Sequence, residues 1–184
     1  MKLRLDPSDE HMHPLEAESN FNESMYFNVF DSEANLGGFF RLGNRANEGK
    51  AEMTTCLYLP DGRVAFMFNR PAIEHNDAFD AGGMRFEVVE PFEELKVRYE
   101  GKVVILDDPL AMADPRTAFK ENPWVECEAD LDFRGVSPMY GGKQVYDDGT
   151  ELELDPEKSF AKAHYEQHCA VQGTIRVAGE VLDI

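Results

Sequence analysis

Hydrophobic residues along the chain occur in short β-favouring runs, separated by glycine, proline and acidic residues. Runs of aromatic and branched side chains that end at such turn residues are typical of β-strands. Their spacing suits a barrel or a sandwich. We therefore predict an all-β fold, an antiparallel barrel or a strongly curved sandwich with short helical insertions. The expected strands are residues 25–30, 39–42, 51–59, 63–69, 84–89, 95–99, 102–106, 125–134, 165–177 and 180–184.

The expected strands differ in how their two faces are composed. Residues 125–134 alternate strictly between apolar and charged side chains, which indicates a strand with one face in water. The strands at 25–30, 39–42, 51–59 and 63–69 do not alternate, because both of their faces carry large apolar groups. We expect a hydrophobic core on one side of these early strands. The other side then needs a ligand, a subunit or a second domain.

Turn residues suggest how the early strands pair. Pro60-Asp61-Gly62 is a strong hairpin signal and sets Tyr58 opposite Val64 and Glu52 opposite Arg70. In the preceding hairpin, the register that keeps Phe40 beside Met53 also sets Arg41 opposite Glu52. This pairing predicts one face with Phe39, Tyr58, Phe66 and Phe68 next to Arg41, Glu52 and Arg70, and an opposite face with Phe40, Leu42, Met53, Leu57 and Met67.

The first of these faces is the candidate binding site. Glu52 lies between two guanidinium groups and is expected to stay ionised. One positive charge remains, which suits an acidic or carbonyl group on an otherwise apolar ligand. The alternative is a cross-strand ion network at the rim of the sheet with no ligand. The predicted ligand-binding residues are Phe39, Arg41, Glu52, Tyr58, Phe66, Phe68 and Arg70.

Two proline-containing segments are predicted to form the short helical insertions. A further turn is expected within the sheet. A short helix is expected from Asp114, as its N-cap, through Lys120. A second is expected from Asp155 through Lys162. Glu100-Gly101 is expected to join the strands at 95–99 and 102–106.

Groups for proton transfer are few, and the candidates are Tyr26, His164, Glu166 and His168. His164 and His168 have a spacing that could share a zinc ion on a helix. Tyr165 stands where the metalloprotease pattern needs glutamate, and on a strand the two imidazoles are roughly 13 Å apart. The chain has no phosphate loop, nucleophile elbow or dinucleotide fingerprint. We therefore expect no metal and no cofactor.

Charge and cysteine content limit which partners and which cellular compartment are expected for the protein. The net charge of −18 disfavours binding to nucleic acid or to an anionic membrane. Three cysteines without metal-binding or redox spacing indicate reduced thiols. No secretory signal and no apolar run of membrane-spanning length is evident, so we expect a cytoplasmic protein. Residues 1–20 are expected to be a polar arm and residues 21–184 a single β domain.

Several motifs in order resemble one family. They are Asn22-Glu-Ser-Met-Tyr-Phe-Asn-Val-Phe-Asp31, Gly38-Phe-Phe-Arg-Leu-Gly-Asn-Arg45, Leu59-Pro-Asp-Gly-Arg63, Asp130-Leu-Asp-Phe-Arg-Gly-Val-Ser-Pro138 and Tyr165-Glu-Gln-His168. From Asn22 onward the chain is similar to the AttH-like lipocalin-like proteins related to hydroxyneurosporene synthase (carotenoid 1,2-hydratase). The resemblance implies a lipocalin-like barrel, the first of two, and hydrophobic ligands of isoprenoid or polyketide type. Relatives in that family include a hydratase and cyclisation enzymes.

Three functions follow as hypotheses. The leading one is a lipocalin-like domain that binds a hydrophobic small molecule as part of a hydratase- or cyclase-like enzyme. Aromatic side chains would stabilise a cationic intermediate there by cation–π attraction. The second is a non-catalytic lipid or terpenoid carrier. The third is a structural β domain whose second apolar face docks a second lipocalin-like domain or subunit. The chain also ends within an expected strand, which favours a longer architecture.

Overall fold

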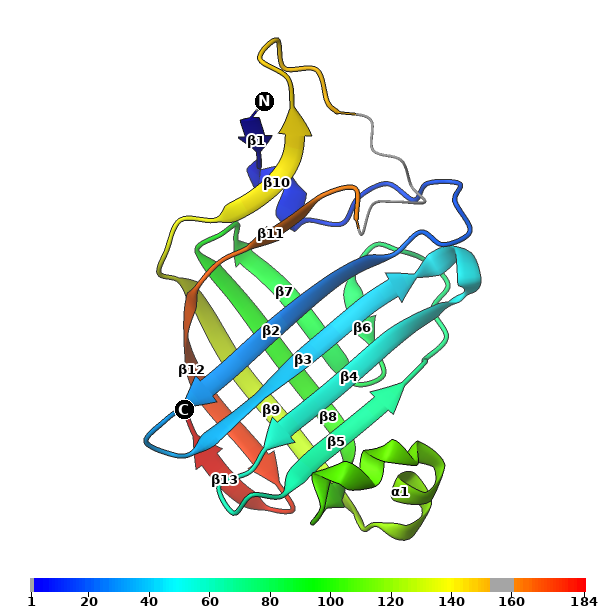
Figure 1. Cartoon of the computed structure of the whole chain (residues 1–184), viewed down its shortest axis with the longest axis vertical. Helices are drawn as coiled ribbons and strands as arrows, with labels where there is room; N and C mark the ends of the chain where they lie inside the picture. Colours follow the sequence, from blue (N-terminus) through cyan, green and yellow to red (C-terminus); the bar gives the residue numbers. More distant parts are fainter. Residues whose placement is uncertain (1, 153–160) are drawn as a thin grey trace.

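Antiparallel β-structure dominates the computed structural model, which describes residues 2–152 and 161–184 (Figure 1). Within these residues the main sheet follows the order β13-β12-β9-β8-β5-β4-β3-β2, with β7 paired to β8 and β6 to β7. The sheet curls into a half-barrel, so the predicted all-β antiparallel fold is confirmed. Its strands are β2 (Glu23–Asp31), β3 (Leu36–Arg45), β4 (Lys50–Tyr58), β5 (Val64–Asn69), β6 (Phe79–Ala81), β7 (Met84–Glu90), β8 (Glu94–Leu106), β9 (Trp124–Gly135), β12 (Cys169–Val177) and β13 (Glu180–Asp183).

Smaller elements lie at the two ends of the half-barrel. A three-stranded sheet sits at one end, at the top of Figure 1. The helix α1 lies at the other end, against β5 and β8. These elements are β1 (Lys2–Arg4), β10 (Tyr140–Val145) and β11 (His164–Glu166) in the small sheet, the 3-10 helices η1 (Pro7–Glu10), η2 (Ala46–Glu48) and η3 (Pro109–Ala113), and α1 (Pro115–Glu121).

Side chains from opposite walls of the half-barrel meet in its interior. The ring of Phe27 on β2 contacts the rings of Phe86 on β7 and Phe133 on β9, with centroids 4.9 Å apart in both pairs. Phe40 and Leu42 on β3 are fully buried in the same cluster. Burying such side chains contributes about 1.5–3 kcal/mol each and is the main stabilising term of the domain. The face predicted to carry Phe40 and Leu42 is therefore the inner face of the half-barrel.

A short helix covers part of the opposite face of these strands. Asp114 caps α1 by accepting a hydrogen bond from the Thr117 N–H at 3.3 Å, and Pro115 fits the first helical turn. Ala118 packs on the outer face of the sheet together with Cys56, Val64, Val104 and Leu106. The helix expected from Asp114 through Lys120 is therefore confirmed. The second expected helix, from Asp155, begins outside the described residues.

Two expectations about strand pairing are wrong. Glu100-Gly101 does not form a turn, because β8 continues through it and pairs with β9 from Glu94 to Val104. Arg41 lies opposite Thr54 and not opposite Glu52, so the register between β3 and β4 is shifted by two residues. The turn between β3 and β4 accounts for this shift in register. It contains η2, which is followed by Gly49 in the left-handed conformation (φ 69°). An even shift keeps every side chain on its expected face.

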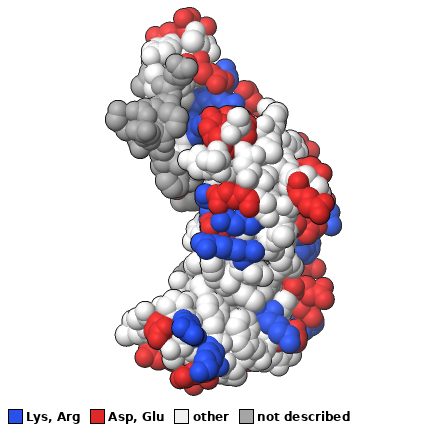
Figure 2. All heavy atoms as spheres, turned by 90° about the vertical axis from the view of Figure 1, so that its right-hand side faces the viewer, with Lys and Arg blue, Asp and Glu red and all other residues white. Residues whose placement is uncertain are grey.

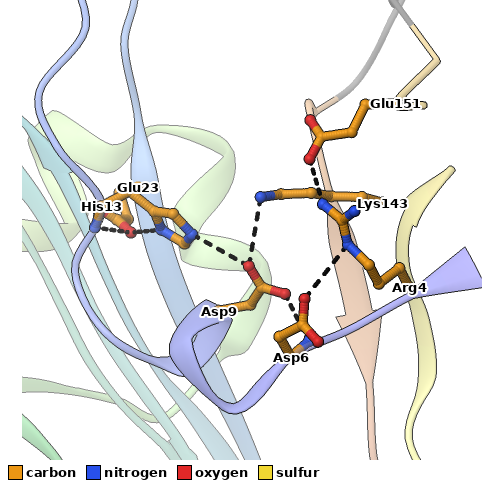
Figure 3. A network of polar contacts seen from close by, with 7 residues as sticks. All are labelled: Arg4, Asp6, Asp9, His13, Glu23, Lys143 and Glu151. Atoms are coloured by element: carbon orange, nitrogen blue, oxygen red, sulfur yellow. Dashed lines mark hydrogen bonds and ion pairs between the residues drawn. The ribbon is translucent and has the colours of Figure 1, made fainter. Parts of the chain in front are cut away.

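Polar contacts fasten the N-terminal arm to the barrel (Figure 3). β1 pairs with β10 in the small sheet. His13 lies between two largely buried carboxylates, with Nδ1 2.5 Å from Glu23 and Nε2 3.6 Å from Asp9. Lys143 on β10 also reaches Asp9, at 3.5 Å. Residues that the sequence indicates only as a polar arm therefore contribute a strand and an ion network to the fold.

Candidate functional site

The outer face of β2–β5 carries the predicted ligand-binding residues in an ordered array. Backbone pairing aligns their side chains across the four strands. Each row places one residue from each strand next to its neighbours. From the end near the small sheet toward α1, the rows are Ser24, Gly43, Glu52 and Arg70; Tyr26, Arg41, Thr54 and Phe68; Asn28, Phe39, Cys56 and Phe66; and Phe30, Gly37, Tyr58 and Val64.

Aromatic side chains on this face are widely open to solvent. Tyr26 and Tyr58 are about half exposed, Phe68 is 40% exposed and Phe30 is 76% exposed. Tyr26 also packs against the partly buried Phe39, with ring centroids 5.2 Å apart and the ring planes tilted by 31°. A contiguous patch of large exposed aromatic groups usually marks a surface that contacts another molecule. We call these five residues the aromatic patch.

One carboxylate joins two arginines beside the aromatic patch. Glu52 lies 3.8 Å from Arg41 Nη1 and 3.3 Å from Arg70 Nη2. The Arg70 guanidinium also lies over the ring of Phe68, with its carbon 5.3 Å from the centroid. The sequence-predicted cluster of Arg41, Glu52 and Arg70 is thus brought together, although its strand register differs from the expected one. We call it the ion cluster.

Gly43 gives the ion cluster its room. A Cβ atom at this position would lie only 3.1 Å from Nη2 of Arg41 and 3.0 Å from the side-chain oxygen of Asn22. The missing side chain therefore leaves room for the Arg41 guanidinium beside Gly43. The backbone at Gly43 is ordinary extended strand, so the need for glycine here is one of space.

The face is hollowed in profile (Figure 2). In this view basic and acidic atoms gather at the middle of the hollowed side and at its lower end, with uncharged surface between them, and the opposite side also carries many charged atoms. At the α1 end, the ring of Phe119 packs on Phe66 at 5.9 Å and stacks on Trp124 at 5.6 Å. The aromatic surface therefore continues from the sheet onto the helix that borders the hollow.

Two phenols and a thiol form the polar centre of the patch. Burial raises the pKa of the Cys56 thiol, and burial together with the nearby Cys56 raises the pKa of Tyr26. The proximity of Cys56 and then burial raise the pKa of Tyr58. All three groups consequently keep their protons at neutral pH. The half-exposed phenols of Tyr26 and Tyr58 can donate hydrogen bonds to a ligand, whereas the Cys56 thiol is buried; none of the three is an activated nucleophile.

The remaining sequence candidates lie away from this array, in or beside the small sheet. His164 and Glu166 are exposed on β11, where the His164 Nε2 is 3.5 Å from a Glu166 oxygen. His168 is exposed just before β12, and its backbone N–H donates to Ser137 Oγ at 3.1 Å. Because His164 begins a strand, the helical spacing needed for a shared zinc ion does not hold. Across residues 2–152 and 161–184, no group of three metal-ligating side chains is found.

The outer face of β8, β9 and β12 is charged, and the sequence predicts the part of it that β9 contributes. Arg98 lies 2.9 Å from Asp130 and 3.0 Å from Asp132. Arg176 is ion-paired in the same way with Glu128 at 2.6 Å. These cross-strand pairs match the alternation of residues 125–134 and are typical of a sheet face in water.

Together these features define an antiparallel β half-barrel with an aromatic and arginine-bearing outer face. The sequence model of a family described as a domain of unknown function (DUF7064) matches residues 6–184. The chain belongs to this family. No curated protein and no solved structure matches it. None of the helices in the described part of the chain is long and apolar enough to cross a membrane.

Proposed function

We propose that this domain binds a hydrophobic small molecule on the outer face of β2–β5. The observation that carries the proposal is the aromatic patch, whose rings lie open to solvent beside the ion cluster in a hollowed surface. Ligand sites combine apolar and aromatic contacts with a few polar groups that fix orientation. Tyr26, Tyr58 and Arg41 supply such groups here.

The position of the site differs from that of a barrel lumen. Phe27, Phe40 and Phe133 belong to the cluster that fills the interior between the walls of the half-barrel. The aromatic residues on the other face form an open surface instead of an enclosed pocket. A ligand on this face would lie between the sheet and the border formed by α1.

The resemblance to the AttH-like and hydroxyneurosporene synthase-related proteins supports isoprenoid- or polyketide-like ligands. Under this proposal the domain is the first of two lipocalin-like barrels in a hydratase- or cyclase-like enzyme. The rings of Tyr26, Phe39 and Phe68 could then stabilise a cationic intermediate by cation–π attraction. A protonated phenol such as that of Tyr26 is a candidate hydrogen-bond donor to the reacting group. A carrier without catalysis would use the same surface.

A second candidate function is the docking of another domain or subunit on this face. The observation that favours it is Phe30, the most exposed ring of the aromatic patch, which lies on β2 at the edge of the sheet. A partner that covers this edge would bury Phe30 and supply backbone partners to β2.

A ligand panel tests the proposal against docking alone. The single tryptophan, Trp124, stacks at the border of the hollow and reports binding by fluorescence. Farnesol, geranylgeraniol, retinol and fatty acids are titrated, and retained ligands are confirmed by native mass spectrometry. We expect at least one of these ligands to bind. The double substitution Tyr26→Ala with Phe68→Ala should weaken this binding at least tenfold. Tyr140→Ala, an exposed tyrosine on β10, is the matched control and should change nothing. Absence of binding across the panel overturns the proposal.

A further inference from the structure

We infer that the hydrophobic ligand carries a carboxylate, which Arg41 and Arg70 hold at one end of the aromatic patch. The inference rests on the proposed function and names the chemical class of its ligand. Its starting point is charge, because the ion cluster has two positive groups and one negative group within a chain of net charge −18. A local positive charge on so acidic a protein attracts an anion to this spot.

The two guanidinium groups keep donors that protein atoms do not use. A guanidinium carries five N–H donors in a planar fork. Arg41 and Arg70 approach Glu52 at ion-pair distances of 3.8 and 3.3 Å. Among residues 2–152 and 161–184, neither side chain makes a shorter polar contact with the protein. Both guanidinium groups can therefore donate hydrogen bonds to a second carboxylate that approaches from the hollow.

Partial burial of Arg41 makes its contact with a carboxylate stronger than one at an open surface, whereas Arg70 is 57% exposed and adds a weaker, more solvated contact. The side chain of Arg41 is 30% exposed and that of Glu52 is 21% exposed. Arg41 is flanked by Tyr26 and Thr54 in its row and lies across Gly43. Reduced contact with water raises the strength of charge-assisted hydrogen bonds.

The charge balance favours a carboxylate over a phosphate. With Glu52 ionised, the ion cluster has one uncompensated positive charge. A carboxylate of one negative charge neutralises it. A phosphate monoester carries about −1.5 to −2 charges at pH 7, so it would leave the cluster with excess negative charge and Glu52 would repel it more strongly than a carboxylate.

The length of the surface suits a long apolar body. Arg41 and Gly37 are four residue steps apart along the extended strand β3, a distance of roughly 13 Å. The rings of Phe39, Tyr58 and Phe30 line this path. Phe30 and Tyr58 both reach over Gly37, whose Cβ would lie 3.2 Å from the Phe30 ring. An acid with an extended hydrocarbon chain can thus place its head on the ion cluster and its tail along the rings.

Four ligands with the same hydrocarbon chain test the inference on the whole chain. Dodecanoic acid, dodecanol, methyl dodecanoate and dodecyl phosphate are titrated by calorimetry at pH 7.5 and low ionic strength. We expect the acid to bind at least tenfold more tightly than the other three. Arg41→Gln with Arg70→Gln should weaken binding of the acid at least tenfold and binding of dodecanol by much less, so that the preference for the acid is lost. Arg85→Gln with Arg176→Gln removes the same charge elsewhere on the surface and should preserve the preference.

Glu52→Gln tests whether Glu52 competes with the ligand carboxylate for Arg41 and Arg70, because it predicts the direction in which the affinity for dodecanoic acid changes. Removing the competing carboxylate should tighten binding of dodecanoic acid several-fold. A closed ion network without a ligand role predicts no change or weaker binding in this variant.

The outcomes separate the inference from the proposed function. Equal binding of acid, alcohol and ester, unaffected by the Arg41 and Arg70 substitutions, overturns the inference and leaves hydrophobic binding intact. Tighter binding of dodecyl phosphate overturns the choice of a carboxylate. If none of the four ligands, and none of the neutral isoprenoids, binds at all, the proposed function itself fails.

Discussion

The backbone N–H of Phe92 donates a hydrogen bond to the carboxylate of Glu10, 3.0 Å away. Glu10 ends η1 in the N-terminal arm, and Phe92 lies in the turn between β7 and β8. The side chain is only 2% exposed, and its other oxygen has no hydrogen-bond partner among the described residues. Burial raises the pKa of Glu10, and the Phe92 N–H offsets part of this effect.

Stability should therefore depend on the protonation of Glu10. Because the folded chain holds this proton more tightly, the Glu10 contribution is most favourable below its ordinary pKa of about 4.3. It is lost as the pH rises through the raised value. Glu10→Gln keeps an acceptor for Phe92 without the charge, and should stabilise the fold at pH 8 by about 1 kcal/mol or more. Urea denaturation of both proteins from pH 4 to 8 measures this.

The control for this prediction is Glu180→Gln, which removes an exposed carboxylate on β13. Its stability difference from the parent chain should not follow the same pH profile. If the Glu10→Gln difference instead shrinks as the pH rises, the assigned direction of the pKa shift is wrong.

Lys143 and Asp9 should hold the N-terminal arm in place. Burial alone would raise the pKa of Asp9, but the Asp6 N–H, Lys143 and His13 together keep it below its ordinary value. Their contribution to stability is fully present above the ordinary pKa of about 4, and it is lost as the pH falls from there through the lowered pKa of folded Asp9. Lys143→Met should speed hydrogen exchange of residues 2–13 up to about fivefold at pH 7, equivalent to about 1 kcal/mol.

A matched substitution isolates this effect. Lys102→Met breaks an exposed pair with Glu126 on the charged face and should leave exchange in the arm unchanged. Equal exchange rates in the Lys143→Met protein and the parent chain would show that β1 pairing alone retains the arm.

The two faces of the early strands should differ in their contribution to stability. Phe40 is fully buried on the inner face of β3, so Phe40→Ala should cost about 3–5 kcal/mol. Phe68 is widely exposed on the outer face of β5, so Phe68→Ala should cost less than about 1 kcal/mol. Chemical denaturation measures both. A large loss for Phe68→Ala would mean that the aromatic patch serves the fold rather than binding.

Local patterns explain why much of this architecture is predictable from sequence. Strand faces follow from the two-residue period, so Phe40 and Leu42 are correctly predicted to share one face, and Phe39 and Arg41 the opposite one. The Pro60-Asp61-Gly62 turn fixes the register of β4 and β5, which places Glu52 beside Arg70. These assignments depend only on residues close together in the chain.

Features that depend on distant contacts are the ones the sequence does not reveal. β1 and β10 are short strands that lie far apart in the sequence, and no local pattern predicts that they pair. The continuity of β8 through Gly101 depends on pairing with β9. The border formed by Phe119 and Trp124 depends on where α1 folds back on the sheet. The sequence indicates this border only through a proline-rich segment that ends at Trp124.

The most direct test of the proposed site is an NMR titration with ring-labelled tyrosine. Tyr26 and Tyr58 lie on the outer face, whereas Tyr99 is buried in the core, with its hydroxyl bonded to the Lys102 carbonyl at 2.9 Å. Addition of dodecanoic acid or farnesol should shift the signals of Tyr26 and Tyr58 and leave Tyr99 unchanged. A shift of Tyr99 with no change at Tyr26 and Tyr58 would place the ligand inside the half-barrel and contradict the proposed surface.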